Sequence, residues 1–188
     1  MTRVLMNLLN APALLLLFTI AIALQTSLFA FYPLNYLQPD IVLVGVIWFA
    51  LHRNFTEGGI LTLLLAEIAE IHTSAPQGLF LLTYILIYLI VRALCKFVAI
   101  TDLSALVLLS MGASIAWKLL CLFILYLLGI SENQWKHTFV LMLPGSVMVG
   151  VTSIWIYKCL KWFDWVTYKD TRARKILEDE LQLEAEGL

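Results

Sequence analysis

Apolar runs separated by short polar segments make up most of this chain, and they restrict its fold more than any other feature. The first run, from Ala11 to Phe31, is long enough to cross a hydrocarbon core of ~30 Å at a helical rise of ~1.5 Å per residue. It could be a signal peptide that follows Arg3, but its length favours a retained first helix. Across the 188 residues, 62% are hydrophobic and 13% are charged, which is more apolar surface than one soluble domain can bury. We therefore predict an all-α integral membrane protein.

Polar and turn-forming residues divide the chain into six predicted helices. Residues 1–165 are expected to form one six-helix transmembrane domain, and residues 166–188 a charged cytoplasmic tail. Pro39 and Asp40 suit the start of the second helix. The second and third helices are shorter than the ~20 residues that ordinarily span a bilayer, so we expect them inside the bundle. The predicted helices cover residues 13–31, 40–51, 59–71, 78–97, 103–128 and 139–160.

The basic residues predict an orientation. If the N-terminus is cytoplasmic, ten of the 12 Lys and Arg residues fall on the cytoplasmic side, with Lys136 outside and Lys118 within the fifth helix. This excess matches the positive-inside rule. We predict a multi-pass membrane protein with both termini in the cytoplasm, where Arg53 serves as an anchor and Arg92 and Lys96 reach for lipid phosphates.

The third helix carries two carboxylates, Glu67 and Glu70. At about 100° per residue, both acids share a face with Gly59, Thr62 and Ala66, whereas large aliphatic residues occupy the opposite face. We expect the aliphatic face to meet lipid and the acids to point inward. Three interpretations remain open: a buried network closed by Lys118, an ion path or binding pocket, and solvated acids at a helix end.

Two further faces predict helix packing. In the fifth helix, Ser110, Ser114 and Lys118 recur every four residues and form one inward stripe. In the sixth helix, small residues form a face for close approach of another helix; they are Gly145, Ser146, Gly150 and Ser153.

No motif in the chain indicates catalysis. It lacks a nucleophile elbow, a phosphate loop, HExxH and GxGxxG. The three cysteines form no CxxC pair and are interpreted as buried hydrophobic residues, and the three histidines lie at helix ends. We therefore expect a protein that is not an enzyme and uses no cofactor or metal.

The segment from Leu24 to Gly78 resembles the rod shape-determining protein MreD family. It has a Pro-initiated second helix, a short basic turn, a Gly-containing third helix that ends in an acid, and a small-residue turn before a Gly that opens the next helix. Glu70 stands where the family usually has Asp, and Ala66 where it usually has Gly. The matching positions are Pro39, His52, Arg53, Gly58, Gly59, Glu70, Pro76 and Gly78.

The resemblance implies a fold similar to the six-helix substrate-binding subunits of energy-coupling-factor vitamin transporters. It also implies a non-enzymatic scaffold of the cell-elongation machinery in the bacterial inner (cytoplasmic) membrane, which binds MreC and works with MreB filaments, RodA and a class B transpeptidase. Such a protein would support lateral peptidoglycan synthesis and rod shape, without contact with nucleic acid. Two alternatives remain: a substrate-binding membrane subunit of a vitamin or metal importer, with an outer pocket near Glu67 and Glu70, and a proton-coupled transporter that uses these acids.

Overall fold

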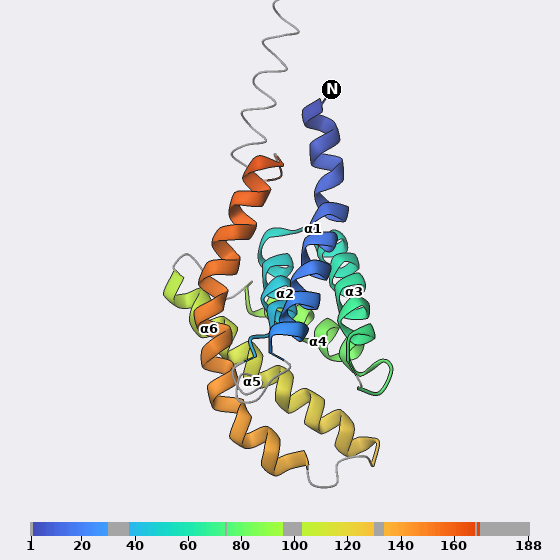
Figure 1. Cartoon of the computed structure of the whole chain (residues 1–188), viewed down its shortest axis with the longest axis vertical. Coiled ribbons are helices and arrows are strands. Elements are labelled where there is room, and N and C mark those ends of the chain that lie inside the picture. Colours follow the sequence, from blue (N-terminus) through green and yellow to red (C-terminus); the bar gives the residue numbers. More distant parts are fainter. Residues whose placement is uncertain are drawn as a thin grey trace, which may run out of the picture.

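The computed structural model describes residues 2–29, 38–73, 75–95, 103–129, 134–167 and 169, with side chains from residue 9 onward and, in the last helix, from residue 142. These residues form an all-helical fold (Figure 1). Its helices are α1 (Thr2–Leu28), α2 (Ile41–His52), α3 (Phe55–Ile71), α4 (Leu79–Leu94), α5 (Leu103–Leu127) and α6 (Gln134–Val166).

Helix α2 lies at the centre of the bundle and packs against each of the other five helices. Every residue from Val42 to Ala50 is buried, because a helix that is apolar on all sides needs neighbours all round. Asp40 caps its N-terminus, with Oδ1 accepting a hydrogen bond of 2.9 Å from the amide of Leu43. The predictions that this short helix lies inside the bundle and begins at an Asp40 cap are confirmed.

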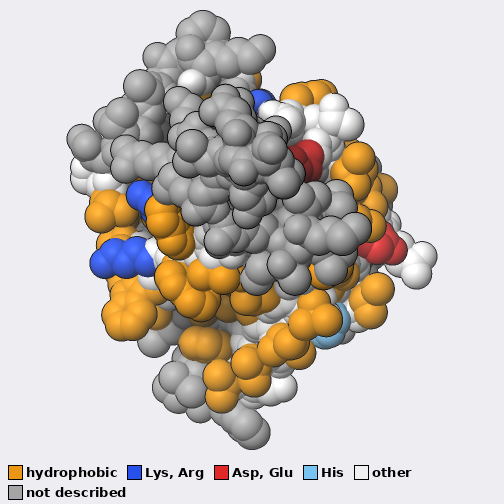
Figure 2. All heavy atoms as spheres, turned by 90° about the horizontal axis from the view of Figure 1, so that it is seen from above, with side chains coloured by type: hydrophobic (Ala, Val, Ile, Leu, Met, Phe, Trp, Pro, Cys, Tyr) orange, Lys and Arg blue, Asp and Glu red, His pale blue; other side chains and the backbone are white. Residues whose placement is uncertain are grey.

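Within the described residues, three helical segments are long and apolar enough to cross a membrane: Leu9–Leu28, Leu103–Leu127 and Met142–Val166. They expose large hydrophobic side chains that no other helix covers, such as Leu108 at 70% and Trp155 at 75%. Seen from the end where α1 begins, the described surface is mostly hydrophobic (Figure 2). These features indicate that the protein is associated with a membrane.

Helix α3 turns a different face inward from the one that its acids predicted. Its buried residues are Gly58, Leu61, Thr62, Leu65, Ala66 and Ala69. Glu67 is exposed, so the expectation that both acids point into the bundle is wrong. The inward face is set by packing against α2, where the side chain of Leu65 is fully buried and would lie 3.1 Å from a Cβ added to Gly45.

The small-residue faces of α5 and α6 lie where they were predicted. Ser110 and Ser153 are 0% exposed, and Ser114 and Ser146 are 1% exposed. Gly150 is buried against Met111 of α5, with room for no larger residue unless Met111 moves. Close approach of the two helices therefore depends on small side chains, as in other membrane bundles.

The boundaries of the outer helices differ from the prediction. Helix α1 already begins at Thr2 and contains Pro12, whereas the prediction began the first helix at Ala13. Helix α6 runs from Gln134 to Val166, whereas the prediction covered only residues 139–160. Asp164 interrupts the apolar run near its end without ending the helix. The predictions for the loop 30–37, for Lys96 and for the charged tail after Lys169 fall outside the described residues.

Candidate functional site

A buried polar cluster ties three distant parts of the chain together, near the start of α1 and the end of α6. We call Asn10, Arg53, Asp164 and Thr167 the Arg53 cluster; all four are 9% exposed or less. Nη2 of Arg53 donates to Oδ1 of Asp164 at 2.6 Å and to Oδ1 of Asn10 at 2.9 Å. Nδ2 of Asn10 donates to Asp164 at 3.1 Å and to Thr167 Oγ1 at 2.6 Å. The cluster thus links α1, the α2–α3 turn and the end of α6.

Arg53 was expected to be a cytoplasmic anchor, and its burial corrects that expectation. Its charge pairs with Asp164, since an unpaired charge is costly in an apolar bundle. The sequence held a signal for this pair, because Asn10 and Asp164 interrupt apolar helices on the side of the membrane where Arg53 was predicted. Asn10 and Asp164 were not among the predicted site residues.

Further contacts fix the short turn between α2 and α3. Nη1 of Arg92 donates a hydrogen bond of 2.6 Å to the carbonyl of Ala50 near the end of α2. Arg92 had been expected to reach lipid phosphates instead. The hydroxyl of Tyr88 donates to the carbonyl of Phe55 at 2.8 Å. Lys169 and Glu57 form a half-exposed ion pair of 3.0 Å at the rim of the Arg53 cluster. The turn is therefore held from α4 on one side and from α6 on the other.

Glu70 acts as a cap for the next helix. Its Oε1 accepts a hydrogen bond from the amide of Gly78, and its Oε2 accepts one of 3.2 Å from the amide of Leu81. These amides begin α4, where the helix dipole favours a carboxylate. Gly78 adopts a left-handed conformation with φ of 86°, which a residue with a side chain adopts at a cost.

The predicted network of Glu67, Glu70 and Lys118 is not what the described contacts show. Glu67 is exposed and Glu70 binds the start of α4. Lys118 instead lines a cavity whose acidic residue is Asp40. The prediction compared only the depths of these residues along the third and fifth helices. It failed because it left out α2, which packs against both α3 and α5.

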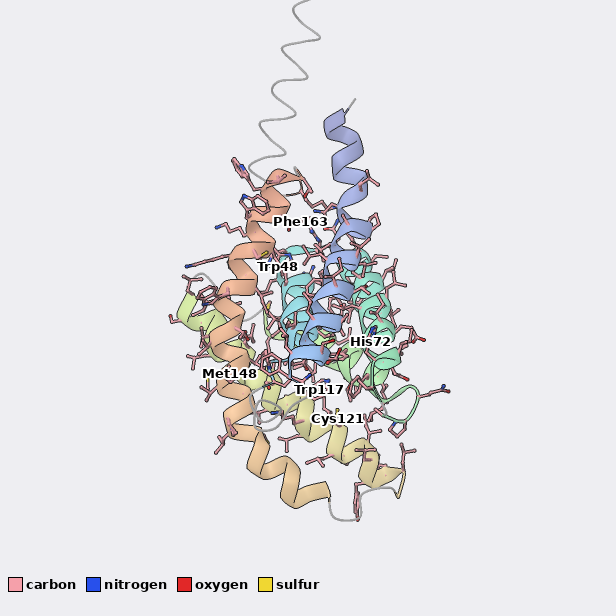
Figure 3. The ribbon with its side chains drawn as sticks, viewed as in Figure 1. Trp48, His72, Trp117, Cys121, Met148 and Phe163 are labelled. Atoms are coloured by element: carbon pink, nitrogen blue, oxygen red, sulfur yellow. The ribbon has the colours of Figure 1, made fainter. Side chains whose placement is uncertain are left out.

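This cavity, which we call the Lys118 cavity, has a volume of about 320 Å³. It lies at the end of the bundle opposite the Arg53 cluster, where α1 and α3 end and α2 and α4 begin; Figure 3 shows Trp117 and Phe163 in these opposite halves. Residues of all six helices line it. They include Gln25, Asp40, His72, Phe80, Tyr84, Trp117, Lys118 and Gly145.

The charged groups of the cavity are firmly placed. Besides the amide of Leu43, Asp40 accepts hydrogen bonds of 3.0 and 3.1 Å from the hydroxyl of Tyr84. Its carboxylate lies close enough to Lys118 for the two charges to attract each other. Gly145 leaves room for the ammonium, because a Cβ at this position would collide with Nζ of Lys118.

Three aromatic rings form one wall of the cavity. Tyr84 and Trp117 are stacked with centroids 5.5 Å apart, and Phe80 meets each of them edge-on, at 5.9 and 5.4 Å. The indole Nε1 of Trp117 is buried and has no hydrogen-bond partner among the described residues. This arrangement gives an apolar surface with polar groups at its edge, which is typical of small-molecule sites.

Among the residues that the structure describes, no group of three His, Cys, Asp or Glu side chains is placed to hold a metal ion. The cysteines are free thiols, and Cys159 is exposed, so its predicted burial is wrong.

The chain was compared with family models, curated proteins and solved structures, and none of them matches it. The geometry of its own residues is therefore the basis for any assignment.

Proposed function

We propose that the chain is a non-enzymatic scaffold of the bacterial cell-elongation machinery, similar to the MreD family. In this proposal it binds MreC in the inner membrane and, through MreC, supports lateral peptidoglycan synthesis with MreB filaments, RodA and a class B transpeptidase. Rod shape depends on this assembly.

The observation that carries the proposal is the structural use of the residues on which the resemblance rests. Arg53 is the hub of the buried cluster, Gly58 lies where α2, α3 and Tyr88 meet, and Glu70 caps the helix that Gly78 opens. These positions build the α2–α3–α4 unit. The use of these positions in building the fold supports a scaffold.

The outer helices offer surface for a membrane-embedded partner. Helices α1, α5 and α6 expose large side chains, including Leu16 at 61% and Phe123 at 56%. A single-span partner such as MreC would bind by packing against such a helix, since close packing drives helix association in lipid.

The proposed orientation places the Arg53 cluster on the cytoplasmic side and the Lys118 cavity outside. A reporter that is active only in the cytoplasm should work when fused after Leu188 or at Asn54, and it should fail at Asn35. Activity at Asn35 would reverse the orientation.

Depletion of the protein in its native cell tests the scaffold function. The cells should lose rod shape and regain it when the wild-type chain is supplied again. Unchanged shape after full depletion would contradict the proposal.

The Lys118 cavity favours a second candidate, a substrate-binding subunit of an importer. Its aromatic wall and polar edge suit an organic vitamin-like molecule better than a metal ion. Depletion would then abolish uptake of one nutrient while cell shape stayed normal.

A further inference from the structure

Glu67 places a carboxylate on the outer surface of α3, far from either end of the apolar segment of α1. A Cβ added to Gly45 of α2 would lie 2.6 Å from the ring of Phe18 in α1 and 3.1 Å from the side chain of Leu65 in α3. These two side chains therefore lie at the same level of the bundle. Glu67 follows Leu65 by two residues, a rise of about 3 Å. It is thus level with the middle of the Leu9–Leu28 segment, which is long enough to cross a membrane.

The surface around Glu67 is an apolar stripe. Exposed residues recur along α3 at intervals of three or four, so they line one side of the helix. We call this set the Glu67 face; it consists of Ile60, Leu63, Leu64, Glu67 and Ile71. Among the residues that the structure describes, none forms a hydrogen bond or an ion pair with the Glu67 carboxylate. A charge that faces hydrocarbon is costly and points to a polar partner, and the described part of the chain supplies none.

A groove between α1 and α3 adjoins the Glu67 face and shares Ile60 and Leu64 with it. It has a volume of about 670 Å³, and the two helices that form it lie side by side (Figure 1). Ala11, Pro12 and Leu15 line it from α1. Such a groove takes the side-chain ridge of another helix, and close packing of this kind drives helix association in lipid.

The charge decides between the possible occupants of this surface. Lipid acyl chains fill an apolar groove but bring no hydrogen-bond donor to the depth of Glu67. A second copy of the chain, related by a twofold axis along the membrane normal, would bring Glu67 against Glu67, and like charges repel. A transmembrane helix with a basic side chain at this depth both fills the groove and pairs with the carboxylate through a charge-assisted hydrogen bond.

We propose that the Glu67 face and the adjoining groove bind one transmembrane helix of another protein, and that this helix carries a Lys or Arg side chain paired with Glu67. The inference deepens the scaffold function, on which it rests, because it names the face that binds a single-span partner. The exposed faces of α5 and α6 then meet lipid.

Site-specific photocrosslinking of the full-length chain in its native membrane tests the surface. A photoreactive amino acid at Leu63, which is 41% exposed, should crosslink the chain to a single-span protein. The matched control carries the same amino acid at Leu108 of α5, which is 70% exposed and lies outside the groove. It should yield at least about tenfold less of this product. A product of two copies of the chain, or crosslinks to lipid alone, would overturn the proposal.

Charge reversal tests the pairing. Glu67→Lys should lower the crosslinking yield from Leu63 about tenfold or more, and replacement of the partner's basic residue by Glu should restore it. Glu67→Gln removes the charge without reversing it and should also lower the yield, whereas Glu67→Asp should keep most of it. The amount of each variant in the membrane normalises the yields. Unchanged yields in Glu67→Gln and Glu67→Lys would refute the pairing, as would a partner whose transmembrane segment contains no Lys or Arg.

This inference and the scaffold function can fail separately. If MreC crosslinks from Leu108 and not from Leu63, the chain is still a scaffold, but the Glu67 face is not its binding surface. If a single-span protein other than MreC passes both the crosslinking and the charge-reversal tests, the Glu67 face is confirmed as a binding surface and the scaffold function is contradicted.

Discussion

The buried ion pair between Arg53 and Asp164 should be strongly coupled, and a double-mutant cycle can measure this. The cycle consists of Arg53→Met, Asp164→Asn and the double variant. Asparagine keeps the shape of the aspartate and one oxygen that can accept hydrogen bonds from Arg53 and Asn10. Each single variant removes one charge and leaves the other buried.

The structure sets the expected magnitude. Arg53 and Asp164 are 5% and 4% exposed, and their closest atoms are 2.6 Å apart. Removal of one partner from such a pair costs about 3–5 kcal/mol. Glu57 lies 3.9 Å from Nε of Arg53 and offsets part of the attraction lost in Asp164→Asn, so we expect about 3 kcal/mol for that variant. It cannot compensate in Arg53→Met, for which we expect the full range of about 3–5 kcal/mol. The double variant leaves no buried charge and should lose only about 1–2 kcal/mol, mainly in hydrogen bonds.

The free energy of unfolding in mixed micelles, followed by circular dichroism during a denaturant titration, provides the assay. The matched control is Lys169→Met, which breaks the half-exposed pair with Glu57 and should cost less than about 1 kcal/mol. Losses that add within about 0.5 kcal/mol in the double variant would show that Arg53 and Asp164 do not interact, and would refute the cluster as the tie between α2 and α6.

Two further predictions concern α3. Gly58→Ala should destabilise the protein by about 1–3 kcal/mol relative to Gly59→Ala. A Cβ at position 58 would lie 2.8 Å from the Tyr88 hydroxyl and 3.0 Å from a backbone oxygen of α2, whereas a Cβ at position 59 would meet only an atom at 3.9 Å. Equal thermal stability of the two variants would contradict this prediction. Glu70→Gln should lower the free energy of unfolding by about 1–2 kcal/mol, because it removes a charged cap from α4. Glu67→Gln, at an exposed position, should change it by no more than about 0.5 kcal/mol. A larger loss from Glu67→Gln in the same unfolding assay would place that acid in a contact.

Much of the fold follows from local rules that a sequence displays. The central position of α2 was predictable because it is apolar all round and too short to span a membrane. The Asp40 cap and the small-residue faces of α5 and α6 were predictable for similar reasons, since each depends on residue type and spacing within one helix.

The sites were harder to predict because they depend on which helices lie next to each other. Periodicity gave the acids of α3 one face, but it could not decide that Leu65 would set the inward direction against α2. Lys118 was paired with the wrong helix for the same reason, and Asp40 was assigned a capping role only. Asn10 and Asp164 are isolated in sequence, and only the bundle brings them to Arg53.

The scaffold function is tested most directly by the partners that the protein retains in its own membrane. An affinity-tagged full-length chain would be extracted in mild detergent, purified, and analysed by mass spectrometry for co-recovered proteins. We predict that MreC is recovered in an amount comparable to the chain itself. Recovery of a pair of importer ATPases without MreC would contradict the scaffold function and favour the importer subunit.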